Sequence, residues 1–88
     1  MANNTKLLQF PCSYPLKVMG RNTNQFHAVV STIIENHVAA DAGVVYRSRS
    51  SSAGKYISIT ATFSVQSQEQ LTAIYQDLNR HELVLMAL

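Results

Sequence analysis

The strict alternation of apolar and polar side chains in residues 54–63, GKYISITATF, most constrains the fold of this chain. Side chains of a β-strand point alternately to opposite faces, so this stretch is predicted to be a strand with one buried face. The predicted buried positions are Ile57, Ile59, Ala61 and Phe63, and the positions between them are Tyr56, Ser58, Thr60 and Thr62. A chain of 88 residues supports one modest core, so the remaining elements must cover the apolar face of this strand.

Two other stretches have apolar residues at helical spacing. The first, residues 21–38, is predicted to begin after an Asn22 or Thr23 cap, and its stripe is Phe26, Val29, Val30, Ile33 and Ile34. The second follows Ser67, which with Gln70 matches a capping box, and its stripe is Leu71, Ile74, Tyr75 and Leu78.

Three further strands are predicted at residues 14–20, 44–50 and 83–88. The order strand, helix, strand, strand, helix, strand predicts an α+β, ferredoxin-like βαββαβ sandwich. Right-handed crossovers then give an antiparallel sheet of order 4-1-3-2 with both helices on one face. Residues 1–13 are predicted to be an N-terminal arm, and residues 14–88 a single domain.

Several motifs in this chain resemble the YbeD-like family of small bacterial proteins. They are FPCSYPLKVMG, the Val-Val-x-x-Ile-Ile-x-x-His pattern of residues 29–37, SSAGKYISIT, LTAIYQDL and VLMAL. The resemblance runs from about residue 10 to residue 88. It implies an ACT-like variant of the ferredoxin-like fold in a cytosolic protein. By analogy with ACT domains, it implies a regulatory module that binds a small molecule or a protein.

Composition and residue spacing favour binding over catalysis. The lone Cys12 excludes an intramolecular disulfide and suits a reducing cytoplasm, and no apolar run resembles a signal peptide or a membrane span. The five carboxylates are scattered, without the pairing that acid–base chemistry needs. The three histidines have no recognised metal-ligand spacing. We therefore expect a cytoplasmic protein that is not an enzyme and has no catalytic residues, metal or cofactor.

The turn between the first strand and the first helix is the predicted ligand site. Gly20, Arg21 and Asn22, together with the free amides of the helix N-terminus, form a plausible anion pocket. The alternative is structural: Gly20 makes the turn, Asn22 or Thr23 caps the helix, and Arg21 is solvated.

The sheet face away from the helices, or the last strand beside it, is predicted to form a homodimer interface. Residues 83–88, LVLMAL, are predicted to be apolar on both faces, with Leu83, Leu85 and Ala87 on one and Val84, Met86 and Leu88 on the other. An exposed apolar edge strand of this kind invites pairing. Alternatively, the N-terminal arm, with Leu7, Leu8 and Phe10, covers this edge within one chain. The predicted interface residues are Met19, Tyr56, Ser58, Thr60, Val84, Met86 and Leu88.

RNA binding on the same face is the alternative function. RNA-binding domains of this topology stack bases on two or three aromatic rings. Here Tyr56 is the one ring on this face, with Lys17, Arg47 and Arg49 as phosphate ligands. The arginines also have a structural explanation, since charge protects an edge strand from pairing. The formal net charge of +2 is low for a nucleic-acid binder, which makes this partner the less favoured one.

Overall fold

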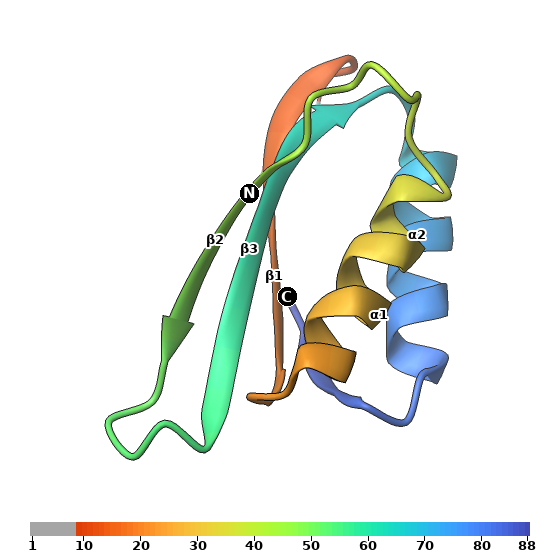
Figure 1. Ribbon diagram of the computed structural model, residues 1–88. Coiled ribbons are helices and arrows are strands. Elements are labelled where there is room, and N and C mark those ends of the chain that lie inside the picture. Colours follow the sequence, from red (N-terminus) through yellow and green to blue (C-terminus); the bar gives the residue numbers. More distant parts are fainter. Residues whose placement is uncertain (1–8) are drawn as a thin grey trace, which may run out of the picture.

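The protein folds as a two-layer sandwich in which two helices cover one face of a four-stranded sheet (Figure 1). The computed structural model describes residues 9–88, so Leu7 and Leu8 of the arm lie outside the described residues. The elements are β1 (Cys12–Arg21), α1 (Asn24–Glu35), β2 (Val45–Ser50), β3 (Tyr56–Val65), α2 (Gln68–Arg80) and β4 (Val84–Ala87). All strand pairs are antiparallel and the order is β2-β3-β1-β4, which confirms the predicted fold and sheet order.

The core lies between the sheet and the helices, as the sequence patterns predict. The alternation along β3 is confirmed, because Ile57, Ile59, Ala61, Phe63 and Val65 are all buried. Each helix contributes three buried residues, which are Phe26, Val30 and Ile34 from α1 and Leu71, Ile74 and Leu78 from α2. Two residues of the predicted α1 stripe, Val29 and Ile33, are only half-buried. Neither helix is long and apolar enough to span a membrane.

The helix N-termini are capped by side chains. Thr23, rather than Asn22, caps α1, and its Oγ1 accepts a hydrogen bond from the Phe26 amide at 3.0 Å. Ser67 caps α2 through the Gln70 amide at 3.1 Å, as the capping-box motif predicts. The return bond differs, because Oε1 of Gln70 accepts from the Gln66 amide at 2.7 Å instead of from Ser67.

Strand β1 begins earlier than the predicted strand, and it continues through Pro15. Lys17 and Leu88 exchange backbone hydrogen bonds of 3.1 and 2.7 Å, so Lys17 directs its backbone groups toward β4. Pro15, two residues away, directs its backbone to the same side, where the described residues provide no pairing strand. Its missing N–H therefore costs no sheet hydrogen bond, which explains how a proline fits inside this strand.

Candidate functional site

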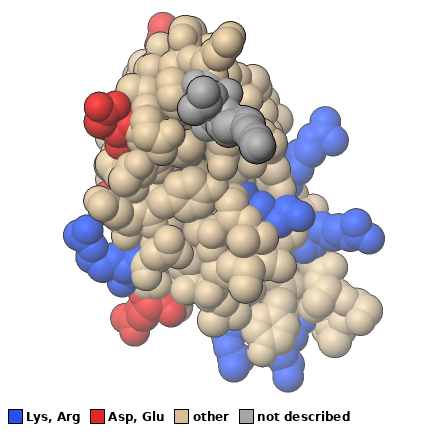
Figure 2. Space-filling view, turned by 180° about the vertical axis from the view of Figure 1, so that it is seen from behind, with Lys and Arg blue, Asp and Glu red and all other residues tan. Residues whose placement is uncertain are grey.

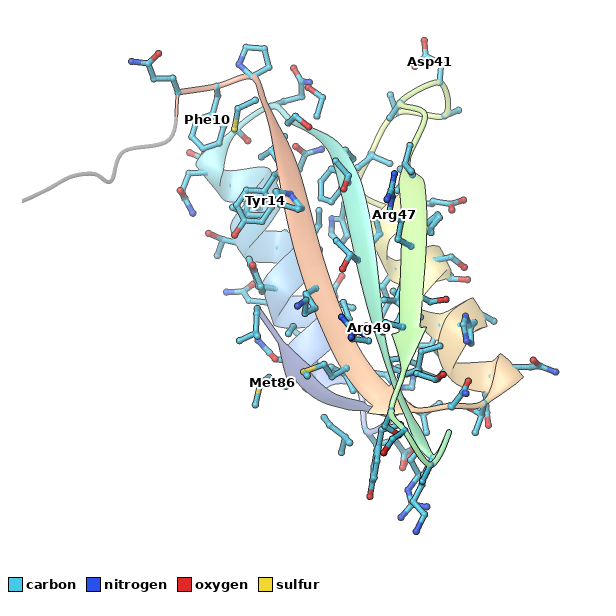
Figure 3. All side chains as sticks on the ribbon, turned by 90° about the vertical axis from the view of Figure 1, so that its left-hand side faces the viewer. Phe10, Tyr14, Asp41, Arg47, Arg49 and Met86 are labelled. Atoms are coloured by element: carbon cyan, nitrogen blue, oxygen red, sulfur yellow. The ribbon has the colours of Figure 1, made fainter. Side chains whose placement is uncertain are left out.

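The open face, defined as the side of the sheet away from the helices, carries aligned rows of side chains. Arg47 of β2 is paired with Thr60 of β3, and Thr60 is paired with Lys17 of β1. Residues paired across antiparallel strands share a face, so both cations project from the open face on either side of a short hydroxyl side chain. Figure 3 looks onto this side of the sheet.

The next row of the open face has a cation at one end and two methionine side chains at the other. Arg49 of β2 is paired with Ser58 of β3, Ser58 with Met19 of β1, and Met19 with Met86 of β4. At the end of the strands, Tyr56 is paired with Arg21. The Arg21 guanidinium lies over the Tyr56 ring, 5.9 Å from its centre, which is within the range of a cation–π contact.

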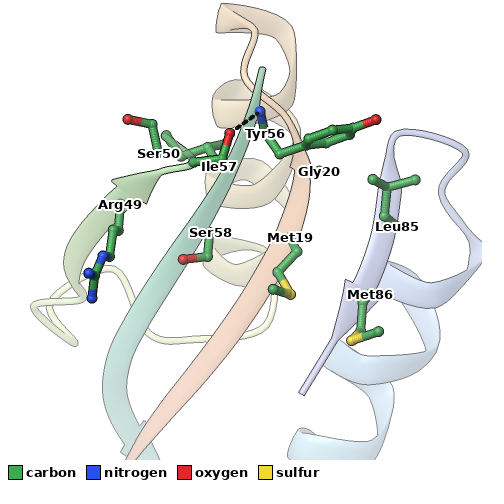
Figure 4. Close-up of a pocket in the computed structure, with 10 residues that line it drawn as sticks. Met19, Gly20, Arg49, Ser50, Tyr56, Ile57, Ser58, Leu85 and Met86 are labelled. Atoms are coloured by element: carbon green, nitrogen blue, oxygen red, sulfur yellow. Dashed lines mark hydrogen bonds between the residues drawn. The ribbon is translucent and has the colours of Figure 1, made fainter. Parts of the chain in front are cut away.

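A hollow of about 450 Å³ opens on this face, and we call it the apolar hollow (Figure 4). The described strands and Ser51 of the loop between β2 and β3 provide its lining, and the side chains of Tyr56, Leu85 and Met86 in this lining are exposed. Its full lining is Met19, Gly20, Arg49, Ser50, Ser51, Tyr56, Ile57, Ser58, Leu85 and Met86. Apolar walls with one cation and a few hydroxyl groups are typical of binding sites for small molecules or peptide side chains.

Charge is separated between the two layers of the protein. Within the described chain, none of the four strands contains a carboxylate, whereas the strands place four cations on the open face: Lys17, Arg21, Arg47 and Arg49. The five carboxylates lie in the helices or in the loops beside them, at Glu35, Asp41, Glu69, Asp77 and Glu82. In Figure 2, basic side chains project from the sheet side at the right, and the acidic side chains in view lie toward the helix side, where basic side chains such as that of Arg80 on α2 also occur.

In the turn predicted to bind an anion, Gly20 has a different role from either of the two predicted ones. Gly20 lies inside β1 with a backbone outside the left-handed region, and it is buried under the ring of Phe26. A Cβ at this position would lie 2.4 Å from Cε1 of that ring, so close packing, rather than a turn, requires glycine here. The interpretation that Gly20 makes the turn is therefore wrong.

The other two residues of this turn point toward the β2–β3 hairpin. Asn22 donates two hydrogen bonds to the hairpin. Its backbone N–H donates to the Lys55 carbonyl at 2.9 Å, and its side-chain Nδ2 donates to the Gly54 carbonyl at 3.2 Å. Arg21 lies over the Tyr56 ring, and together with Glu82 it also lines a separate hollow beside the first turn of α1. Within residues 9–88, the predicted turn therefore lies next to the open face, and Arg21 belongs to both. An anion site at the helix N-terminus stays a prediction.

Strand β4 departs from the predicted alternation. Val84 is paired with Gly20 and Met86 with Met19, so the pairing shifts by one residue between them. Because of this bulge, Val84 packs against the core, whereas Leu85 is 62% exposed and lines the apolar hollow. The prediction that Val84 shares a face with Met86 was wrong, and Leu85 was missed because no residue type signals a bulge here.

Polar contacts on the helix side link the two layers and the two helices. Nε2 of His37 lies 2.6 Å from Oδ2 of Asp77, and Nε2 of Gln70 donates to the His37 carbonyl at 2.7 Å. Tyr46 of β2 donates to Oε2 of Glu35 at 2.6 Å, and burial together with this hydrogen bond raises the pKa of Tyr46. Among residues 9–88, no three His, Cys, Asp or Glu side chains are grouped to hold a metal ion.

A model of the family described as "Protein of unknown function (DUF493)" matches residues 5–88. The chain belongs to the DUF493 family. A UPF0250 protein of Neisseria meningitidis serogroup A is 40% identical over 86 residues, covering 98% of this chain and 94% of that protein. A UPF0250 protein of Nitrosomonas europaea is 34% identical over 82 residues, covering 93% and 94% of the two chains. These matches confirm the resemblance to the YbeD-like family of small bacterial proteins.

Two solved structures share the fold of this DUF493 protein. The solution structure of protein HP0495 from H. pylori has a TM-score of 0.77 at 14% identity, covering 96% of this chain and 88% of that one. The ACT domain from the GTP pyrophosphokinase of Chlorobium tepidum has a TM-score of 0.63 at 11% identity, covering 89% and 96%. These likenesses confirm the ACT-like fold.

Proposed function

We propose that this DUF493 protein is a non-enzymatic, ACT-like regulatory module that binds a small molecule or a protein at its open face. The observation that carries the proposal is the apolar hollow of about 450 Å³, which Arg49 helps to line on a sheet face that the helices leave uncovered. The similarity of the fold to an ACT domain supports a regulatory role at the level of architecture.

The chemistry of the hollow favours an anionic occupant with an apolar part. Met19, Leu85 and Met86 provide apolar contacts, and Arg49 is the cation among the lining residues. Arginine binds carboxylate and phosphate through two parallel hydrogen bonds, which makes it well suited to orient such a group. As part of the same proposal, we place the protein in the cytoplasm, where the lone Cys12 stays reduced.

A thermal-shift screen against amino acids, nucleotides and carboxylic acids tests this function. A ligand that binds only the folded state at about 100 times its Kd adds about 2.7 kcal/mol, which raises the Tm by about 10 °C or more. The shift should disappear in Arg49→Ala and persist in Arg80→Ala, whose side chain lies on α2. A shift that persists in Arg49→Ala would place the ligand site elsewhere in the protein.

RNA binding is the second candidate, and the four cations of the open face favour it. Phosphate contacts make RNA affinity fall steeply with salt. Retention of the protein on immobilised RNA at low salt, lost on raising the salt and lost in Arg49→Ala, would support this candidate. We rank it second because, among the described strand residues, Tyr56 is the one aromatic ring on the open face, and Arg21 already lies over that ring.

Self-association is also part of the proposal, and the charges of the open face decide its geometry. Stacking two open faces would bring Lys17, Arg21, Arg47 and Arg49 of both copies together without a carboxylate from any described strand. Like charges facing each other in an interface are destabilising. We therefore propose a homodimer through the edge of β4, where Leu85, Met86 and Leu88 are exposed.

A further inference from the structure

We infer that the open face docks an acidic, extended segment of a partner protein that also carries one apolar anchor side chain. This inference rests on the proposed function, because it names the class of partner that binds at the same face. It follows from the arrangement of the cations, from the position of the apolar hollow relative to them, and from the shortage of aromatic rings. Each of these features is on the described strands.

The cations flank a trough of short side chains. Ser58 and Thr60 of β3 lie in the middle of the face, and Arg47 and Arg49 of β2 project on one side of them. On the other side, Lys17 of β1 is paired with Thr60. Neighbouring strands are about 4.8 Å apart, so the two columns of cations begin about 10 Å apart, which is the width that an extended peptide needs.

The spacing of the cations on β2 fits acidic side chains of an extended chain. Arg47 and Arg49 are two residues apart on β2, whereas Lys17 and Arg21 are four residues apart on β1, with Met19 between them. Two residues of a strand span about 7 Å, and alternate side chains of any extended peptide repeat at that same distance. A segment with carboxylates at alternate positions therefore meets Arg47 and Arg49 in register, and Lys17 lies across the trough from Arg47.

The apolar hollow supplies an anchor point in the row of Arg49. The pairing Arg49–Ser58–Met19–Met86 places the cation and the two methionines in one line across the sheet. Leu85 completes the exposed apolar wall. Methionine side chains are flexible and polarizable, which suits them to enclosing an apolar side chain of a partner. Buried apolar anchors typically supply most of the binding energy at such interfaces, and charges around them set orientation and specificity.

Other occupants of this face fit less well. A second copy of the chain presents the same cations and no carboxylate from its described strands, so its open face repels this one. Single-stranded RNA gains most of its non-ionic binding energy by stacking bases on several rings, and the open face offers Tyr56 alone, with its ring face against Arg21. An acidic peptide needs neither a second ring nor a complementary copy.

Fluorescence anisotropy with a designed peptide tests the inference. The probe is a fluorescein-labelled peptide of about eight residues, long enough to follow most of β3, with Glu at alternate positions and one central Leu. We expect a Kd on the order of 10–100 μM at low salt, which rises as added salt screens the charges. A peptide with Lys in place of every Glu should not bind.

Two protein variants form a matched pair for this assay. Arg49→Glu and Arg80→Glu each change the net charge from +2 by −2 to 0, but Arg49 lies on the open face and Arg80 lies on the helix layer. Both side chains are exposed, so both variants should fold. We expect Arg49→Glu to weaken binding about tenfold or more and Arg80→Glu to change it about twofold or less.

A second comparison tests the anchor. Met19→Ser, at a β1 residue that lines the hollow and is not part of the proposed dimer edge, should weaken binding of the peptide with Leu, and it should leave binding of a peptide with Gly in place of Leu nearly unchanged. Equal losses for both peptides, the absence of peptide binding to the wild type, or equal effects of Arg49→Glu and Arg80→Glu would each overturn the inference. The inference would also be overturned, in favour of RNA, if labelled oligouridylate bound more tightly than the peptide and this binding depended on Arg49.

The proposed function and this inference fail in different ways. If the peptide does not bind but a metabolite raises the Tm and loses its effect in Arg49→Ala, the acidic partner is excluded and the binding module remains. If neither the peptide nor the metabolite panel binds in an Arg49-dependent manner, both proposals fall.

Discussion

Replacing Gly20 with Ala inserts a methyl group into the closest contact between β1 and α1. The added Cβ would lie 2.4 Å from Cε1 and 2.7 Å from Cδ1 and Cζ of Phe26, a ring that is 1% exposed. Carbon atoms pack at about 3.5–4.0 Å, so the ring or the strand must move by about 1 Å. Overpacking costs about 1–3 kcal/mol, and a contact this short belongs near the upper end of that range.

A smaller gain opposes this cost, because Ala loses about 0.5–1 kcal/mol less conformational entropy than Gly in a strand. We therefore expect Gly20→Ala to lower the free energy of unfolding by about 2 kcal/mol. Urea unfolding measures this loss as a lower midpoint with an unchanged slope. Repeating the substitution in a Phe26→Leu protein identifies the cause. With the ring removed, Gly20→Ala should lower the free energy of unfolding by less than about half of its effect in the wild type.

Gly54→Ala is the matched control, since Gly54 has φ of +75° and nothing within 4 Å of its would-be Cβ. Its cost of about 1 kcal/mol comes from the backbone alone and should be the same with Phe26 or Leu at the ring position. The reasoning is refuted if Gly20→Ala is as stable as the wild type, or if Phe26→Leu leaves its cost unchanged.

Three further perturbations probe the core, the alkaline limit and the oligomeric state. Ile34→Ala, at a fully buried site, should cost about 2–5 kcal/mol in urea unfolding, and the half-buried Ile33→Ala clearly less; equal losses would contradict the observed helix face. Burial and the 2.9 Å hydrogen bond with Tyr14 raise the pKa of Tyr75, so the folded state keeps a proton that the unfolded state releases near pH 10. The stability that comes from the protonated Tyr75 side chain is complete below about pH 10 and is lost as the pH rises further. Over that pH range, the Tm of Tyr75→Phe should therefore fall by less than the Tm of the wild type. Met86→Lys should shift the protein from dimer to monomer in analytical ultracentrifugation, and a wild type that is monomeric at high micromolar concentration would refute the dimer.

The fold was predictable because it depends on periodic patterns within single elements. The alternation from Tyr56 to Phe63 fixes which face of β3 is buried, and the helical stripes fix the inner faces of α1 and α2. These patterns report burial directly, since each apolar side chain must reach the same core. The family resemblance added the ACT-like variant, which periodicity does not distinguish from other folds of the same topology.

The details of the site were less predictable because they depend on contacts between elements. The bulge that turns Val84 inward and Leu85 outward arises from pairing with β1, and both residues are equally apolar in the sequence. Gly20 follows a strand pattern and precedes a cap, which indicates a turn, yet its role is set by the Phe26 ring above it. The residue types fit both arrangements, and packing alone decides between them.

The net charge of this protein does not reveal how its charges are distributed. A net charge of +2 weighs against an anionic partner when the charges are taken as evenly spread. The strands hold four cations on the open face, however, and the carboxylates lie with the helices, so the small net charge conceals a strongly cationic sheet face. A partner that approaches the open face meets a local field set by those four cations, which fall within about one or two Debye lengths of it, and the more distant carboxylates are screened. The same field opposes stacking of two open faces, which is why we propose the β4 edge for self-association and an acidic partner for the open face.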